Sequence, residues 1–258
     1  LETLEWVRDQ DQAQLSDMTG TSAARMSLVP QASQVLAELV RRLEPERILI
    51  SAYGLREGLL YRQMPEAMRA RDPLIEVCRH MEAASARTPG FGDVMADWLA
   101  PVYAAAGAAE LRLVRAACLL HDINWRAHPD YRAELCFESV TRANVAGVEH
   151  DERVFLGLAL MNRYKNAQAT EYARLYGPLL SEQRRMEAVT LGRAMRLGAM
   201  LSGSVTAALR ESQLTVCEGV LTLTLSGAPR EFVGEAVDRR MQSLANKLDL
   251  TPEVKFGV

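Results

Sequence analysis

A short apolar run followed by two closely spaced glycines limits most strongly what this chain can fold into. The run, Ile48–Ile50, is too short for a helix and follows the helix-breaking pair Glu44-Pro45, so it predicts a buried strand. The next residues, Gly54-Leu55-Arg56-Glu57-Gly58, predict a turn, because glycine allows a sharp bend and close backbone approach to a ligand. Since open α/β sheets bind ligands at that end of their strands, we expect a turn that faces a ligand.

Helical patterns lie on both sides of this predicted strand and turn. Upstream, Ser27-Leu28-Val29-Pro30 predicts a helix start, because proline is tolerated in the first turn. Apolar residues then recur on one face as far as Leu43, and Pro45 ends the helix. Downstream, Ala116–Ile123 has the sequence Ala-Ala-Cys-Leu-Leu-His-Asp-Ile, which predicts the end of a buried helix with a vicinal His-Asp pair.

This order of helix, strand, Gly-x-Arg-Glu-Gly turn and His-Asp helix resembles the exopolyphosphatase/guanosine pentaphosphatase (Ppx/GppA) family. The resemblance is strongest over residues 28–62 and 110–165. It implies an α+β, mostly helical fold, in which an HD-like helical domain is flanked by the end of an actin-like (ribonuclease H-like) lobe and a small α/β tail. The implied segments are 1–66 for the carboxyl-terminal end of the second actin-like lobe, 67–185 for the HD-like domain and 186–258 for the tail.

The same resemblance implies an enzyme that releases orthophosphate from polyphosphate or guanosine pentaphosphate with Mg²⁺. In the family, the Gly-rich phosphate loops and the water-activating carboxylates precede the matched part, and residues 1–27 contain no such loop. We therefore expect a carboxyl-terminal piece of a longer enzyme, inactive alone, with no catalytic residue of its own and no cofactor assigned to it. It would supply the cleft wall, part of a polyanion path and the surface of a homodimer.

Composition narrows the partners of the chain. With 258 residues, 48% of them hydrophobic, it can bury a full core, and its net charge of −3 argues against a general nucleic-acid binder. No apolar run is long enough to cross a bilayer, and the four cysteines form no Cys-x-x-Cys pair, which favours reduced thiols in the cytoplasm. Only three of the 30 basic residues are lysines. The arginine excess indicates either the codon bias of a GC-rich genome or guanidinium groups that grip phosphate oxygens.

His121-Asp122 is the pair with the most specific chemistry. Active HD phosphohydrolases use such a vicinal pair as two ligands of one metal, with further His and Asp residues completing the site. Here His80 lies too far upstream for the usual first ligand, and the Arg-Tyr-His of the family appears as Arg163-Tyr164-Lys165. The incomplete set favours a vestigial HD domain that lends shape and positive charge. The competing interpretation is that both side chains only close a helix end inside the core.

Seven residues are candidates for contact with a phosphorylated substrate. By family resemblance, Gly54 would permit close backbone approach, and Arg56 and Glu57 would shape the cleft wall. Further basic residues cluster in sequence around the HD-like helices and are candidates for a polyanion channel, although each alone is more typical of a solvated surface charge. These channel candidates are Arg126, His128, Arg163 and Lys165, with Arg132 among them in the sequence.

Beyond residue 108, periodicity predicts helices followed by a hairpin and a final helix. Leu221, Leu223 and Leu225 alternate with threonines, as expected of a strand with one buried face. The predicted helices cover 108–121, 131–144, 151–164, 186–209 and 232–248, and the predicted strands cover 214–217 and 220–225, with Glu218-Gly219 between them.

Two other functions remain open on the sequence. One is an autonomous, metal-dependent HD phosphohydrolase, which needs at least four metal ligands in one pocket. The other is a non-catalytic binding or assembly module, in which the domain serves only as a scaffold.

Overall fold

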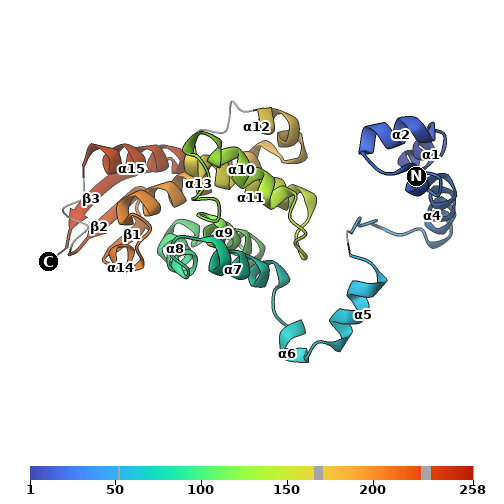
Figure 1. Cartoon of the computed structure of the whole chain (residues 1–258). Coiled ribbons are helices and arrows are strands. Elements are labelled where there is room, and N and C mark those ends of the chain that lie inside the picture. The colour runs from blue at the N-terminus through green and yellow to red at the C-terminus, as the bar shows by residue number, and fades with distance from the viewer. Residues whose placement is uncertain (52, 166–170, 228–233, 258) are drawn as a thin grey trace. The chain divides into compact units, whose positions relative to one another are not determined.

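Four helices make up the first of two units into which the chain divides. The computed structural model describes residues 1–51, 53–165, 171–227 and 234–257, and its contacts separate Leu1–Gly54 from Leu55–Val258. The first unit contains α1 (Glu2–Arg8), α2 (Gln12–Thr19), α3 (Ala23–Met26) and α4 (Val29–Leu43) (Figure 1). The domain boundaries at residues 66 and 185 stay predictions.

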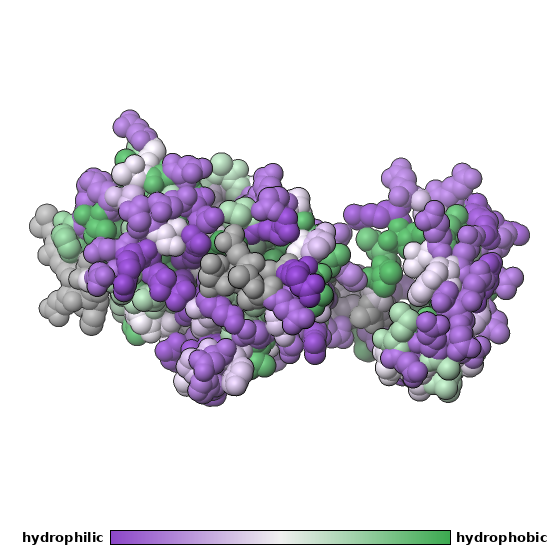
Figure 2. Space-filling view, turned by 90° about the horizontal axis from the view of Figure 1, so that it is seen from above, coloured by the Kyte–Doolittle hydropathy of each residue, from purple (hydrophilic) through white to green (hydrophobic). Residues whose placement is uncertain are grey.

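The predicted helix that begins near Pro30 is confirmed as α4. Proline occupies its first turn, and Glu44 ends it in the left-handed conformation. The helix packs on α1 through Ala37, and Arg41 pairs with Glu5 at 2.7 Å. Most of its apolar face is nevertheless exposed, with Leu43 73% accessible, and Figure 2 shows hydrophobic residues on the surface of this unit.

The strand and turn predicted after α4 are wrong. Ile48–Ile50 forms no regular element, and Ile50 is 83% exposed. A strand needs a neighbour to satisfy its backbone groups, and the described part of this unit contains no strand that pairs with it. The glycine turn is instead the start of helix α5 (Leu55–Gln63), where Glu57 in the first turn complements the helix dipole. Because no sheet anchors a turn here, local helix propensity determines that these residues start a helix.

The second unit is α+β and mostly helical, as predicted, whereas the actin-like and HD-like assignments remain predictions. Its helices and strands follow one another along the chain, with one small sheet near the end. Among the described residues they are α5 (Leu55–Gln63), α6 (Glu66–Arg69), α7 (Pro73–Ser85), α8 (Phe91–Leu99), η1 (Ala100–Tyr103), α9 (Ala108–Leu120), α10 (Pro129–Thr141), α11 (His150–Tyr164), α12 (Glu171–Tyr176), η3 (Gly177–Leu179), α13 (Glu182–Ser202), α14 (Thr206–Arg210), β1 (Ser212–Cys217), β2 (Val220–Leu225), α15 (Glu235–Leu248) and β3 (Thr251–Phe256).

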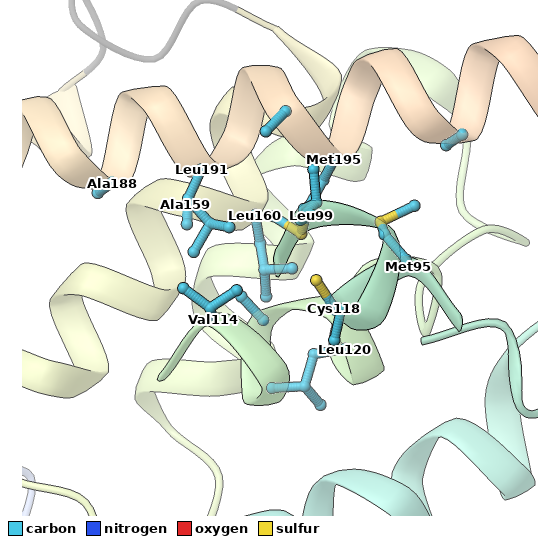
Figure 3. Close-up of a cluster of buried hydrophobic side chains, with 14 of the residues drawn as sticks. Met95, Leu99, Val114, Cys118, Leu120, Ala159, Leu160, Ala188, Leu191 and Met195 are labelled. Carbon is cyan, nitrogen blue, oxygen red and sulfur yellow. The ribbon is translucent and has the colours of Figure 1, made fainter. Parts of the chain in front are cut away.

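The core of this unit lies where α8, α9, α11 and α13 meet. Figure 3 shows Leu191 and Met195 of α13 beside Leu160 of α11, and Cys118 of α9 close to the same cluster. Each of these side chains is fully buried. The helices predicted over 108–121, 131–144 and 151–164 are confirmed as α9, α10 and α11.

Two glycines let the helices of this core approach closely. A Cβ on Gly192 of α13 would lie 2.4 Å from the Cβ of Asn162 and 2.5 Å from the carbonyl oxygen of Ala159, both on α11. A Cβ on Gly157 would lie 2.6 Å from the ring of Phe137 on α10. The absence of these two side chains therefore sets the spacing of α10, α11 and α13.

The helix predicted over 186–209 is interrupted. α13 ends at Ser202 because Gly203 takes the left-handed conformation (φ 59°) that commonly terminates helices, and α14 begins at Thr206. The predicted hairpin is confirmed, since β1 and β2 pair antiparallel with Cys217 opposite Val220. Its turn residues, Glu218 and Gly219, both have positive φ, as a two-residue hairpin turn requires.

The sheet has a third strand that the periodicity did not predict. β3 pairs parallel to β2, with Val254 opposite Leu223, and α15 makes the connection between them. The final predicted helix is confirmed from Glu235 onward, whereas Phe232 and Val233, also predicted to belong to it, lie outside the described residues. No helix in the described ranges is long and apolar enough to cross a membrane.

Candidate functional site

The His-Asp pair lies at the buried end of α9. His121 follows the last helical residue, and both His121 and Asp122 are 1% exposed. The Nδ1 of His121 lies 2.8 Å from the carbonyl oxygen of Cys118, while its Nε2 is buried without a hydrogen-bond partner. Burial, helped by the positive charge of Arg163, lowers the pKa of His121 to about 3. The ring is therefore neutral at neutral pH, with its proton on Nδ1 facing the carbonyl.

Asp122 is held by basic and phenolic groups. Arg87 donates to both carboxylate oxygens, at 3.1 and 3.2 Å, and the Tyr164 hydroxyl lies 3.4 Å from one of them. No group of three or more His, Cys, Asp or Glu side chains in the described ranges is arranged to hold a metal ion. Arg87 balances the charge of Asp122, and this ion pair anchors the end of α9 to its surroundings. Metal binding by His121 and Asp122 stays an untested prediction.

The candidates around the predicted turn lie at and just before the start of α5. Gly54 belongs to the first unit, and Arg56 and Glu57 lie in the first turn of α5, a helix with no buried residue. The turn geometry on which their assignment depended is absent. Their role in substrate binding is an untested prediction.

Two of the channel candidates, and Arg132 beside them, serve local structure. Arg126 lies over the Trp125 ring at 4.6 Å, and the Nδ1 of His128 accepts from the backbone of Asp130 at the start of α10. Arg132 donates to the carbonyl oxygens of Trp125 and Ala127. These contacts hold the turn between α9 and α10.

Arg163 and Lys165 lie at the end of α11. Arg163 is buried, with its guanidinium 4.5 Å from the centre of the Tyr164 ring and 4.0 Å from Asp122. Lys165 ends the helix and forms an ion pair with Glu134 of α10. Its side chain also lines a pocket, so it is the one predicted candidate that lines the site described next.

A basic pocket of about 80 Å³ opens where α11, α13 and α15 meet, large enough for several waters by the rule that one water needs roughly 10–15 Å³. Arg193 and Arg196 lie one turn apart on α13 and so share a face, and Arg240 comes from α15. The remaining lining residues are Asn162, Lys165 and Ser243. α13 packs against both α11 and α15 (Figure 1), which brings these groups together.

The arginines of this pocket repel one another. Burial, then the charge of Arg240, lowers the pKa of Arg193, and burial with Arg240 and Arg163 lowers that of Arg196. In the described part of the chain no acidic side chain forms an ion pair with Arg193, Arg196 or Arg240. The Nε of Arg240 is also buried without a partner. An anion in the pocket would relieve the repulsion and accept from that nitrogen.

Comparison with protein families identifies the part of the chain that contains this pocket. The model of the exopolyphosphatase C-terminal family matches residues 74–251. The chain belongs to this family. The match confirms the resemblance to the carboxyl-terminal portion of Ppx/GppA proteins. A search of curated proteins found no match.

The family match covers both the His121-Asp122 pair and the whole basic pocket, but not Gly54, Arg56 or Glu57. Sequence reasoning missed all three arginines that line the pocket. The spacing of Arg193 and Arg196 on a helix rich in small residues was an available signal. No signal in the sequence pointed to Arg240, because only packing brings α15 against α13.

Proposed function

We propose that this chain is the carboxyl-terminal part of a hydrolase of the exopolyphosphatase type, and that its basic pocket holds part of a polyanionic substrate. The family match supports a hydrolytic parent. The single observation that carries the binding role is the convergence of Arg193, Arg196 and Arg240 without acidic partners in the described structure. Arginine forks suit phosphate oxygens, so polyphosphate or guanosine pentaphosphate is the substrate we propose.

The pocket would contribute binding rather than chemistry. Hydrolysis of a phosphoanhydride needs a positioned water and stabilisation of the charge on the transferred phosphoryl group, for which we propose Mg²⁺ in the parent enzyme. The pocket side chains are basic or neutral, so they can bind and orient phosphate oxygens. Each phosphate they contact displaces condensed counterions, and binding therefore weakens as salt is added.

We also propose that the parent is cytoplasmic and works as a homodimer. The cysteines support a reducing compartment, because all four are free and three of them, Cys78, Cys118 and Cys136, are buried. Burial raises the pKa of the Cys136 thiol to about 11, which keeps it protonated and unreactive. The dimer rests on family resemblance alone.

The binding role is tested by Arg240→Gln. Loss of one charge-assisted contact, about 1.5–3 kcal/mol, predicts roughly tenfold or greater loss of affinity for long-chain polyphosphate at low salt. Titration by calorimetry with the complete 258-residue chain measures it. Arg239→Gln is the matched control, because Arg239 is on the same helix but exposed and paired with Glu235. Equal affinities for the two variants and the parent chain would refute the proposed pocket.

The chain alone should not hydrolyse polyphosphate. Incubation with long-chain polyphosphate and Mg²⁺ is expected to release no orthophosphate above buffer, because we place the catalytic carboxylates in the preceding part of the enzyme. Steady release in proportion to chain concentration would contradict this division. It would also favour the autonomous HD phosphohydrolase if His121→Ala abolished the release.

A further inference from the structure

One acidic side chain forms an ion pair with a residue that lines the basic pocket. Glu134 of α10 accepts from the Nζ of Lys165 through one carboxylate oxygen, while the other oxygen is buried without a hydrogen-bond partner. Neither side chain is fully buried: the exposed fraction is 28% for Glu134 and 41% for Lys165. Within the described structure, this is the one ion pair that involves a cation of the pocket.

We propose that Glu134 is a built-in counter-anion that holds Lys165 until a chain of phosphates displaces it. This inference rests on the proposed function of the pocket. Glu134 would then determine specificity, because a ligand displaces it only if it binds Lys165 more strongly than a single carboxylate does. A single orthophosphate would leave the pair intact, whereas a long polyphosphate would reach Lys165 and the arginines together.

The structure favours a displaceable pair over a structural one. Asp72 is a carboxylate with a structural role, since it accepts from the Arg112 side chain and from the backbone of Leu74 and Ile75. Among the described residues, Glu134 accepts only from Lys165 through one oxygen, and its other oxygen has no hydrogen-bond partner. Partly exposed ion pairs contribute little net stability, so a multiply charged ligand can compete with this one.

The positions of the two residues also fit the role. Glu134 is held at a fixed place, because its neighbours Ala133, Cys136 and Phe137 are buried in the core. Lys165 is at the last turn of α11, where its backbone is fixed by Met161, but its long side chain has rotatable bonds. The backbones of both residues are therefore fixed, and we expect the longer, more exposed lysine side chain to be the group that moves toward a ligand.

The experiment compares Glu134→Gln with the parent chain. Affinity for long-chain polyphosphate is expected to rise roughly three- to tenfold, because Lys165 is freed and a repelling charge is removed. One added phosphate contact also steepens the slope of log affinity against log salt by about 0.7–0.9. Glu138→Gln is the matched control. Glu138 lies one turn along α10, accepts a hydrogen bond from the Tyr172 hydroxyl and pairs with Arg142. Its replacement should leave the affinity and the salt slope unchanged.

A second variant separates displacement from simple repulsion. In the Lys165→Gln background, Glu134→Gln should give a smaller gain in affinity and no steeper salt slope, because there is no ammonium to release. The same gain and slope in both backgrounds would overturn the inference. If Glu134→Gln does not fold, Glu134→Asp replaces it, since the shorter side chain reaches Lys165 less well and should change affinity in the same direction.

Two outcomes distinguish this inference from the function on which it rests. If Arg240→Gln weakens binding but Glu134→Gln leaves affinity and salt slope at the parental values, the pocket stands and the role of Glu134 is refuted. If the parent chain shows no salt-dependent binding of polyphosphate, both are refuted.

Discussion

At the scale of single residues, a neutral histidine in the core is the feature with the clearest consequence. The ring of His121 packs 5.1 Å from that of Phe91, and its one hydrogen bond is to a backbone carbonyl. The pKa of His121 lies below the ordinary value because protonation would bury a charge in the core, and because Arg163 and, to a smaller extent, Arg87 would repel it. The folded chain therefore resists a proton that the unfolded chain accepts.

This difference predicts a pH dependence of stability. The pKa of His121 is about 3 in the folded chain, against 6.5 for an ordinary histidine. Stability from the neutral ring is therefore complete above about pH 6.5 and is lost as the pH falls toward 3, by up to about 1.4 kcal/mol per pH unit. His121→Gln should be less stable at pH 7.5 but should lose less stability between pH 6.5 and 4.5. Urea unfolding at several pH values measures both chains, and parallel curves would contradict the prediction.

At the scale of helices, the basic pocket depends on how closely α11 and α13 pack. Gly192 of α13 lies against Asn162 of α11, and the same two helices carry Lys165, Arg193 and Arg196. The distance between the helices therefore also sets the distance between the cations. If the pocket binds polyanions as we propose, Gly192 links the packing of the two helices to that binding.

Replacement of Gly192 by alanine should show this link. Because the new Cβ would meet the backbone oxygen of Ala159 as well as a side chain, the helices must separate, at a cost of about 1–3 kcal/mol typical of overpacked cores. Thermal unfolding should give a lower midpoint, and polyphosphate affinity should fall with it. Gly58→Ala is the control, since nothing lies within 4 Å of its Cβ position, and an unchanged or slightly higher midpoint is expected because alanine favours a helix. A Gly192→Ala chain with parental stability would show that the helices can adjust.

At the scale of the whole molecule, local sequence patterns predicted most helices but not the elements that depend on contacts between distant residues. The helices that became α9, α10, α11 and α15 follow from apolar periodicity, and the β1–β2 hairpin follows from alternation around a two-residue turn. The strand at Ile48–Ile50 did not form, because β-structure depends on a partner that local sequence does not specify. β3 was missed for the complementary reason: its six residues, Thr251–Phe256, include Pro252 and only half of them are apolar, but β2 lies beside them.

The candidate site divides in the same way. The sequence by itself determined the family resemblance, the mostly helical α+β class, the buried His121-Asp122 helix end and an arginine excess suited to phosphate. Only the tertiary structure decided which of those arginines lie together in one pocket. Arg193 and Arg196 meet Arg240 because α13 packs against α15, and Lys165 joins them because Gly192 lets α11 approach. Periodicity records which face of a helix is buried, but the identity of the neighbouring helix depends on contacts between residues distant in the chain, and a binding pocket is made of those contacts.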